Sequence, residues 1–286
     1  ILLQRSSVKS LTFLGDMFDG VQCPCILLQL IATGKPLSTA GMMIEDRTRT
    51  YTIAMERTVV PENFSFRMTD EEYRVLEKIK NSIPVCYLAD HADFALGIVT
   101  GNNKKFLSAE KTEHSEMVLK GTDICKYHIN PAKQYLRFEP EQFQQVAPLE
   151  IYRAPEKLLY RFISNQLVVA YDDRQMLSLN SCNIVIPKIE GMQIKYILAI
   201  LNSSVSQFVY QKEFHSIKVL RAHMEHIPIP RVGKAIQNEI IAMTEPLICG
   251  MGKEAAETCQ KRLDCRIMDL FRLSAEEQWI IRHALH

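Results

Sequence analysis

The sequence has 286 residues, a hydrophobic share of 47% and a formal net charge of +1. This is the composition of an ordinary globular protein, and the near-zero charge excludes a chain that binds nucleic acid through a uniformly basic surface. No apolar run is long enough to span a bilayer, and no basic segment followed by an apolar stretch predicts a signal peptide, so we expect no membrane partner.

The eight cysteines are scattered along the chain, and none of them forms a C-x-x-C pair. Zinc sites usually need thiolates or imidazoles at close, paired spacing, and the two close histidine pairs have no cysteine partners at such spacing. We therefore expect no metal site. Unpaired cysteines in apolar stretches are typical of a reduced protein, which predicts a cytoplasmic location.

The first part of the chain, to about residue 51, has the pattern of strands. The nearly continuous apolar run Val21–Ala32, followed by a Gly-Pro turn, predicts a buried strand. Thr69 and Glu72 form a capping box that starts a helix extending to Lys80. Because the chain begins with Ile1 in the middle of a pattern, we expect it to be a fragment of a longer polypeptide.

The middle of the chain alternates short strands and turns. Residues 95–107 predict a strand, a turn at Gly101 that tolerates positive φ, and a return strand. Pro155 suits the first position of a helix, so we predict a helix from there to Ile163. Two further strands are expected at 167–170 and 177–186, on either side of Asp172-Asp173-Arg174.

The last third is mainly helical. An apolar helix over 194–201 is interrupted by Asn202-Ser203-Ser204, whose short polar side chains can cap a second helix. A basic run from Lys212 to Arg221 then predicts a loop, because the Ile-Pro-Ile-Pro segment ending at Pro230 excludes a helix. Further helices follow from residue 231, and the last begins at a second capping box, Ser274 to Glu277.

Three segments, taken in order, resemble one protein family. They read GIVTGNNKKF at 97–106, APEKLLYRFISNQLVVAYD at 154–172, and YILAILNSSVSQFVYQKEF at 196–214 with its HIPIP ending at 226–230. Together they resemble the C-terminal specificity (target-recognition) domain of TaqI-like N6-adenine DNA methyltransferases and of fused restriction-modification enzymes. The resemblance covers roughly residues 95–285. A weaker one, LGDMFDGVQCPCILLQLIATG at 14–34, is to the last strands of the methyltransferase catalytic domain.

The resemblance implies an α+β fold with a mixed-sheet target-recognition domain and a helical C-terminal brace, preceded by the tail of an α/β methyltransferase sheet. We expect that tail at 1–60, a linker helix at 61–84, the specificity domain at 85–230 and the brace at 231–286. The implied function is sequence-specific recognition of double-stranded DNA, with the methyltransferase domain of the same polypeptide as a partner.

The chain lacks the motifs that would carry catalysis. The family's N-P-P-Y and its S-adenosylmethionine-binding F-x-G-x-G are absent, as are a P-loop, G-x-S-x-G and H-E-x-x-H. No acidic residue has a lysine two positions on, as a D/E-x-K nuclease core requires. We therefore expect no catalytic residue and no cofactor here, and S-adenosylmethionine only in the full-length enzyme. A non-enzymatic protein-interaction domain on a similar scaffold remains the alternative.

Cationic side chains on loops are the candidates for DNA contacts, since phosphates attract cations and base edges in the major groove accept hydrogen bonds from them. A single basic residue on a loop is more often simply solvated, and that interpretation stays open for each of them. The candidate residues are Lys104, Lys105, Arg153, Arg161, Arg174, Gln211, Lys212, His215, Lys218 and Arg221.

Overall fold

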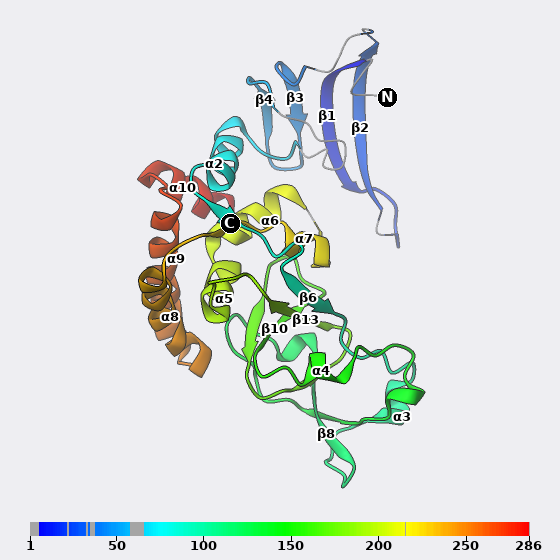
Figure 1. Cartoon of the computed structure of the whole chain (residues 1–286). Helices are drawn as coiled ribbons and strands as arrows, with labels where there is room; N and C mark the ends of the chain where they lie inside the picture. Colours follow the sequence, from blue (N-terminus) through cyan, green and yellow to red (C-terminus); the bar gives the residue numbers. More distant parts are fainter. Residues whose placement is uncertain are drawn as a thin grey trace. The chain divides into compact units, whose positions relative to one another are not determined.

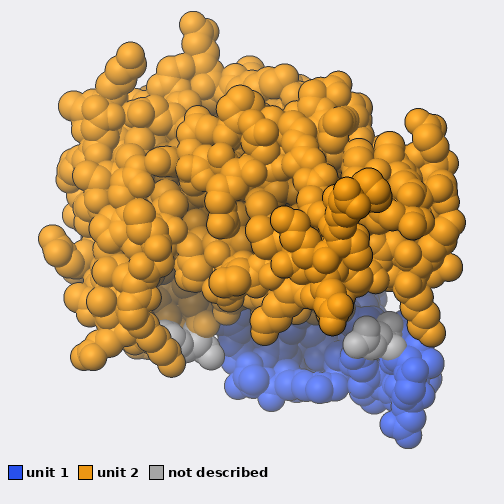
Figure 2. Space-filling view, turned by 90° about the horizontal axis from the view of Figure 1, so that it is seen from below, with its two compact units in different colours: residues 1–76 blue, residues 77–286 orange. Residues whose placement is uncertain are grey.

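The computed structural model describes residues 6–21, 23–32, 34, 38–57, 66–214 and 216–285. The chain divides into two compact units, residues 1–76 and 77–286, which Figure 2 shows in different colours. The division falls within helix α2 (Asp70–Asn81). Its start is the expected capping box, because Thr69 and Glu72 exchange hydrogen bonds between side chain and main chain.

Unit 1 is built on a four-stranded sheet. Its strands are β1 (Ser6–Asp16), β2 (Pro24–Ala32), β3 (Met42–Glu45) and β4 (Thr50–Ile53), in the order β2-β1-β3-β4. The β1–β3 pair is parallel, and the β1–β2 and β3–β4 pairs are antiparallel. Met42 and Ile44, alternate residues of β3, are buried with Val8 and Leu11 of β1, between which β1 has a register shift.

Strand β2 differs from the expectation. It is a strand, but it is not buried: Ile26, Leu27 and Ile31 are each more than half exposed. Among the described strands β2 lies at the edge of the sheet and pairs with β1, and no described element covers these side chains. Apolar character alone does not bury a strand; a second layer must cover it.

Unit 2 contains two four-stranded sheets and a two-stranded ribbon. The first sheet is antiparallel, in the order β11-β10-β13-β6, and the second has the order β12-β8-β9-β7. The first consists of β6 (Ala92–Ala95), β10 (Lys157–Arg161), β11 (Val169–Asp172) and β13 (Cys182–Pro187). The second consists of β7 (Leu107–Ser108), β8 (Ser115–Leu119), β9 (Gln134–Arg137) and β12 (Leu177–Ser178). The ribbon pairs β5 (Val85–Cys86) with β14 (Ile229–Pro230).

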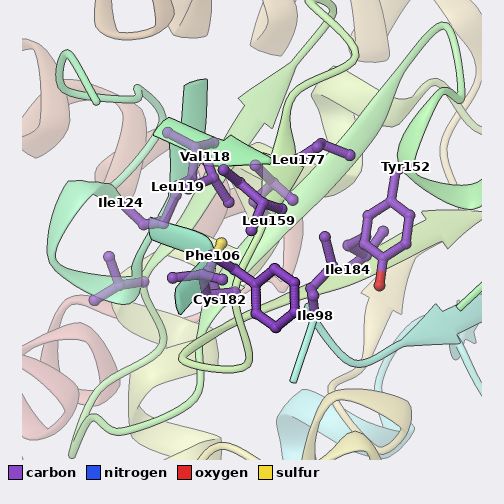
Figure 3. Packing of buried hydrophobic residues seen from close by; sticks show 14 residues of the cluster. Ile98, Phe106, Val118, Leu119, Ile124, Tyr152, Leu159, Leu177, Cys182 and Ile184 are labelled. Carbon is purple, nitrogen blue, oxygen red and sulfur yellow. The ribbon is translucent and has the colours of Figure 1, made fainter. Parts of the chain in front are cut away.

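Both sheets contribute to one hydrophobic core. Leu159 and Ile184 from the first sheet pack with Val118 and Leu177 from the second (Figure 3). Tyr152, at the end of the short helix α4 (Leu149–Tyr152), closes this core and donates its hydroxyl to the carbonyl of Leu96 at 3.2 Å. The core therefore fixes the two sheets to each other.

Two glycines allow the backbone around Leu179 and Ser181 to approach closely. A Cβ placed on Gly97 would lie 2.1 Å from the carbonyl oxygen of Leu179, and one on Gly121 would lie 2.5 Å from that of Ser181. Any other side chain would collide with main chain there, so these glycines are needed for packing. Gly101 is different: its φ of +74° is the positive value that the sequence predicts.

Two predicted elements are wrong. The segment after Gly101 is not a return strand but the helical turn α3 (Asn103–Phe106), because the Asn102 side chain accepts from the main-chain N–H of Lys105 and caps it. The segment after Pro155 is not a helix but β10, whose buried Leu158, Leu159 and Tyr160 lie between β11 and β13. A continuous apolar run suits a central strand as well as a buried helix.

Two side chains near the break between α5 (Ile194–Asn202) and α6 (Ser204–Glu213) form hydrogen bonds with the outer edge of the first sheet. The carboxamide of Asn202 both accepts from the N–H of Val169 and donates to its carbonyl, at 3.1 and 2.8 Å. Gln207 does the same for Leu167, at 2.9 Å for both bonds. Two side chains thus take the place of a neighbouring strand for this buried edge.

The remaining helices form the C-terminal part of unit 2. They are α7 (Arg221–Glu225), α8 (Lys234–Cys249), α9 (Lys253–Leu270) and α10 (Ala275–Ala284); the chain also has two 3-10 turns, Gly121–Asp123 and Pro140–Gln142. Helix α8 contacts α5, and α9 and α10 contact α6; Figure 1 shows these three helices gathered on one side of the unit. The predicted capping box at Ser274 and Glu277 is present. The predicted α+β fold class is confirmed, whereas the division into four functional segments stays a prediction.

Replacing Asn202 by Ala should lower the free energy of unfolding by about 2–4 kcal/mol, because the N–H and carbonyl of Val169 would lose both side-chain bonds in a buried place. Urea unfolding followed by circular dichroism measures this. Asn165→Ala, at an exposed position of the preceding loop, is the matched control and should change stability by no more than about 0.5 kcal/mol. Equal stabilities for the two variants would contradict the role assigned to Asn202.

Replacing Gly97 by Ala should lower the free energy of unfolding by about 1–3 kcal/mol, because the added methyl group collides with the main chain of Leu179 and Cys182. Gly252→Ala is the control, because no atom lies within 4 Å of its Cβ position and its φ is negative. Thermal melts of the two variants, together with their soluble yields, provide the measurement. A Gly97→Ala protein as stable as the control would show that the backbone can move apart at little cost.

Candidate nucleic-acid interface

The basic run that the sequence predicts as a loop is partly helical. Helix α6 continues to Glu213 and α7 begins at Arg221, so only 214–220 separates them. Lys212 is therefore on a helix, with an exposed fraction of 6% and its ammonium 5.8 Å from the ring of Phe208. The expectation of an exposed Lys212 is wrong, since the apolar face of α6 continues through it. His215 lies outside the described residues.

Lys218 and Arg221 do reach the surface. Lys218 is exposed, while its main chain forms a bridge with Ile163 that fixes its position. Arg221 is the first residue of α7, and 61% of its side chain is exposed. Its guanidinium lies 5.2 Å from the ring of Phe94 and 2.7 Å from a carboxylate oxygen of Glu225. The hydrogen bond to Glu225 raises the pKa of Arg221, so this side chain is always a cation.

Arg221 borders a hollow that we call the Arg221 cleft. It has a volume of about 700 Å³ and is lined by 92–96, which includes strand β6, by 145–148, by Ile151 and by Arg221. The main chain of Gln145 is fixed by two hydrogen bonds with Val99, at 2.9 and 3.1 Å. Its exposed side-chain amide has no hydrogen-bond partner in the described part of the chain.

The groups in the Arg221 cleft match those that read base edges. A guanidinium fork pairs with the two acceptors of guanine, a glutamine amide pairs with adenine, and an apolar surface contacts the thymine methyl. The cleft contains one group of each kind: the guanidinium of Arg221, the amide of Gln145 and the apolar side chain of Leu96, which is 44% exposed. Asp93 also lines the cleft, but its carboxylate is paired with Lys188 at 2.5 Å.

Arg153 and Arg174 come together at a second, smaller hollow of about 290 Å³, which we call the Arg174 cleft. Arg153 is held there: it binds both carboxylate oxygens of Glu116, at 2.6 and 2.7 Å, and the carbonyl of Gln175 at 2.8 Å. Arg174 and Lys111 also line this cleft, are exposed, and make no ion pair with any described residue. These two cations are available to phosphates.

The turn that carries Arg174 is held by a buried charge pair. Asp172 accepts from the N–H groups of Arg174 and Met176, both at 2.9 Å. The ammonium of Lys157 lies 2.5 Å from the same carboxylate, and neither side chain is exposed. Burial lowers the pKa of Lys157, while Asp172 opposes that shift. Asp172 is therefore structural: it holds the turn that carries the candidate Arg174.

The other predicted residues are dispersed. Lys104 and Lys105 are exposed on α3, and Lys105 donates to Gln142 at 2.6 Å. Arg161 donates to the carbonyl of Ile124 at 2.9 Å, so its guanidinium holds the loop that contains Ile124. Gln211 is on α6 and lines a hollow formed with α9 and α10. The nine predicted residues that the structure describes thus do not form one surface.

Sequence reasoning missed Phe94, Lys111 and Gln145, which the structure adds to these clefts. Phe94 reads as an ordinary strand residue, and Lys111 stands in a mixed-charge run, EKTEHSE. Gln145 is one of several glutamines in the segment 142–145. No local pattern distinguishes these residues, because their positions depend on pairings across more than 40 residues, such as Val99 with Gln145 and Phe94 with Val185.

The described ranges contain no group of three or more His, Cys, Asp or Glu side chains that could hold a metal ion. None of their helices is both long and apolar enough to cross a membrane.

Comparison with known families identifies part of this unit. Residues 116–229 match the model of the TaqI-like C-terminal specificity domain. This segment is a TaqI-like specificity domain. It contains strands β9 to β13, all but the first residue of β8, and Lys218 and Arg221, and the resemblance expected from the sequence is thereby confirmed. No curated protein sequence matches the chain.

Solved structures show a similar fold. The type IIL restriction-modification enzyme MmeI, solved in complex with DNA, aligns over 98% of this chain with a TM-score of 0.57 and 9% identity. The chain spans 45% of that MmeI chain. The type IIG restriction endonuclease BpuSI (TM-score 0.40, 10% identity, 94% of this chain and 44% of that one) is less similar. So is the HsdS subunit of Thermoanaerobacter tengcongensis (TM-score 0.38, 14% identity, 76% and 50%).

Replacing Lys157 by Met should lower the free energy of unfolding by about 3–5 kcal/mol, because it leaves the Asp172 carboxylate buried without its counterion. Adding Asp172→Asn to that variant should recover part of the loss, since the unpaired charge is then removed. A double-mutant cycle in urea measures the coupling between the two side chains. Additive losses would show that the pair is not coupled.

Proposed function

We propose that this chain is the DNA target-recognition part of a restriction-modification enzyme. The observation that carries the proposal is the TaqI-like specificity domain at 116–229, which includes the exposed Lys218 and Arg221. The fold likeness to MmeI, which was solved in complex with DNA, supports it. The chain is nearly neutral overall, so its DNA contacts depend on local groups.

In this proposal the Arg221 cleft reads base edges. The Arg221 guanidinium lies over the ring of Phe94, and its other face is exposed to solvent. The main chain of Gln145 is hydrogen-bonded to that of Val99, which fixes the origin of the Gln145 side chain. Fixed donors of this kind discriminate between bases, because a wrong base leaves them unpaired. The phosphates are contacted by Lys218, Lys111 and Arg174. These contacts hold the duplex in register but do not distinguish one base sequence from another.

The whole enzyme is proposed to be an N6-adenine DNA methyltransferase, with or without a fused nuclease, acting in the cytoplasm. The exposed Ile26, Leu27 and Ile31 of edge strand β2 support a further catalytic domain in the same polypeptide, because such an edge is suited to pairing with another strand. In that arrangement unit 1 completes the catalytic sheet and unit 2 provides target specificity.

S-adenosylmethionine belongs to that further domain and not to the described residues. A glycine-rich turn binds such a ligand by leaving space beside its backbone. At Gly97 and Gly121 this space is already filled by the main chain of Leu179 and Ser181. Gly97 and Gly121 therefore do not form such a turn, and the function proposed for this chain is recognition alone.

Binding to DNA tests the proposal against the alternative of a protein-interaction domain. A duplex is first selected from a random pool by the unchanged chain, and its affinity is then compared with that of a scrambled duplex by fluorescence anisotropy. A fall in affinity as salt rises indicates counterion release from phosphates. Absence of any selected sequence, with no affinity for either duplex at low salt, would contradict the proposed function.

Arg221→Gln should weaken binding to the selected duplex by about 1–3 kcal/mol and reduce its advantage over the scrambled one. Lys218→Ala should instead weaken both duplexes alike and lower the salt slope by about one. Arg262→Gln, at an exposed position on α9, is the control and should behave as the unchanged chain. If Arg221→Gln retains full sequence preference, the bases are read elsewhere.

A further inference from the structure

A third hollow in unit 2 lies away from the residues assigned to DNA. It has a volume of about 610 Å³, within the usual range of small-molecule sites. Helices α6, α9 and α10 surround it, together with the loop residues Lys126 and Gln166. We call it the α6–α9–α10 cleft; its lining residues are Lys126, Gln166, Ser204, Gln207, Gln211, Lys261, Asp264, Cys265, Arg282 and Leu285.

Positive charge predominates in this cleft. Three cations, Lys126, Lys261 and Arg282, line it with a single carboxylate, that of Asp264. That carboxylate is already occupied, because it accepts from the main-chain N–H and the hydroxyl of Ser204, at 2.9 and 2.8 Å. None of the three cations forms an ion pair within the described part of the chain.

The partners that these cations do have are weak ones. Arg282 donates to the sulfurs of Cys265 and Met268, at 3.4 and 3.8 Å, and to the amide oxygen of Gln278 at 3.1 Å. Lys126 donates only to the carbonyl of Asn202, at 3.3 Å. A guanidinium that faces thioethers and thiols has donors left for stronger acceptors, and oxyanions are the acceptors that it binds best.

Lys126 is held in this place by strained backbone. The residue after it, Tyr127, has a φ of +73°, which is rare for a bulky side chain. Tyr127 is held by main-chain hydrogen bonds with Val169 and Tyr171, at 2.7 and 3.1 Å. Burial lowers the pKa of Lys126, although the charge of Asp264 acts in the opposite direction. An added anion would stabilise the ammonium form.

We propose that the α6–α9–α10 cleft binds a small molecule that carries a phosphate group. The three cations would hold the phosphate, and the amides of Gln166 and Gln211, which make no hydrogen bond with another described residue, would bind the polar remainder of the ligand. Gln207 is not available, because both ends of its amide are bonded to Leu167. The volume is suited to a ligand of about nucleotide size. This site is independent of the DNA-reading role proposed above.

The test uses the 286-residue chain with inorganic phosphate, AMP and unphosphorylated adenosine as probes. Cys265 lines the cleft and is exposed, so its rate of alkylation, measured by mass spectrometry, reports occupancy. Cys249, also exposed but not among the lining residues, is the internal control. The only tryptophan, Trp279, lies one helical turn before Arg282 on α10, and its fluorescence gives an independent titration.

The proposal expects AMP to protect Cys265 but not Cys249, with a Kd below about 1 mM, and phosphate to compete with it. Adenosine should give no protection. Lys261→Gln and Arg282→Gln should each weaken AMP binding roughly tenfold to a hundredfold, because each removes charge-assisted hydrogen bonds. Lys253→Gln, exposed at the start of α9, should leave the affinity unchanged. Lys126→Met should behave like the first two variants if circular dichroism shows that it folds.

Three results would overturn the proposal. One is no protection of Cys265 by phosphate or AMP up to about 10 mM. Another is equal AMP affinity for all folded variants, which would place the binding elsewhere. The third is protection by a short DNA duplex with none by AMP, which would assign the cations to the DNA backbone.

Discussion

The interaction on which unit 2 depends is the pairing of two carboxamides with the outer edge of strand β11. Asn202 and Gln207 pair with the main chain of Val169 and Leu167, and the main chain of Tyr127 is a further partner at this edge, bonded to Val169 and Tyr171. The break between α5 and α6 sets the spacing of these two side chains. Because the edge is buried, unpaired backbone there would cost more than most single contacts supply. The LNS motif of the sequence therefore has a structural explanation.

The same pairing organises what surrounds it. It fixes α6 against the sheet, and α6 in turn contacts α9 and α10. One end of α6 leads to Lys218 and Arg221, while its Ser204 and Gln211 face the α6–α9–α10 cleft. Helices α9 and α10 thus do more than pack against the core, since they line two sides of the α6–α9–α10 cleft.

Several glycines and charged residues of unit 2 serve packing or hold the protein's own loops. Gly97 and Gly121 permit close backbone approach, and Asp172 with Lys157 forms a buried pair that orders a turn. Arg153 and Arg161 are bonded to protein groups. A cation that already has a bidentate carboxylate partner is a poor candidate for phosphate, because breaking that pair offsets the new contact. The available cations are those with few partners, such as Arg174 and Lys111.

Some features follow from local rules and were predictable from the sequence. Both capping boxes, the helix break at Asn202 to Ser204, the positive φ of Gly101 and the α+β class depend on residues close together in the chain. The specificity-domain resemblance was also visible, because three motifs occur in the family's order. Such signals involve short-range hydrogen bonds and periodicity, which the chain carries with it in any context.

Other features were decided only by tertiary structure. The run at 157–161 became a strand because two neighbouring strands flank it, and β2 is exposed because nothing described covers it. Lys212 is buried because α6 continues two residues into the run predicted as a loop, to Glu213. The two clefts proposed for DNA, and the α6–α9–α10 cleft, join residues that lie many tens of positions apart. Sequence by itself determines which groups are present, but the long-range pairing of strands and helices decides which of them meet and which remain free to bind a ligand.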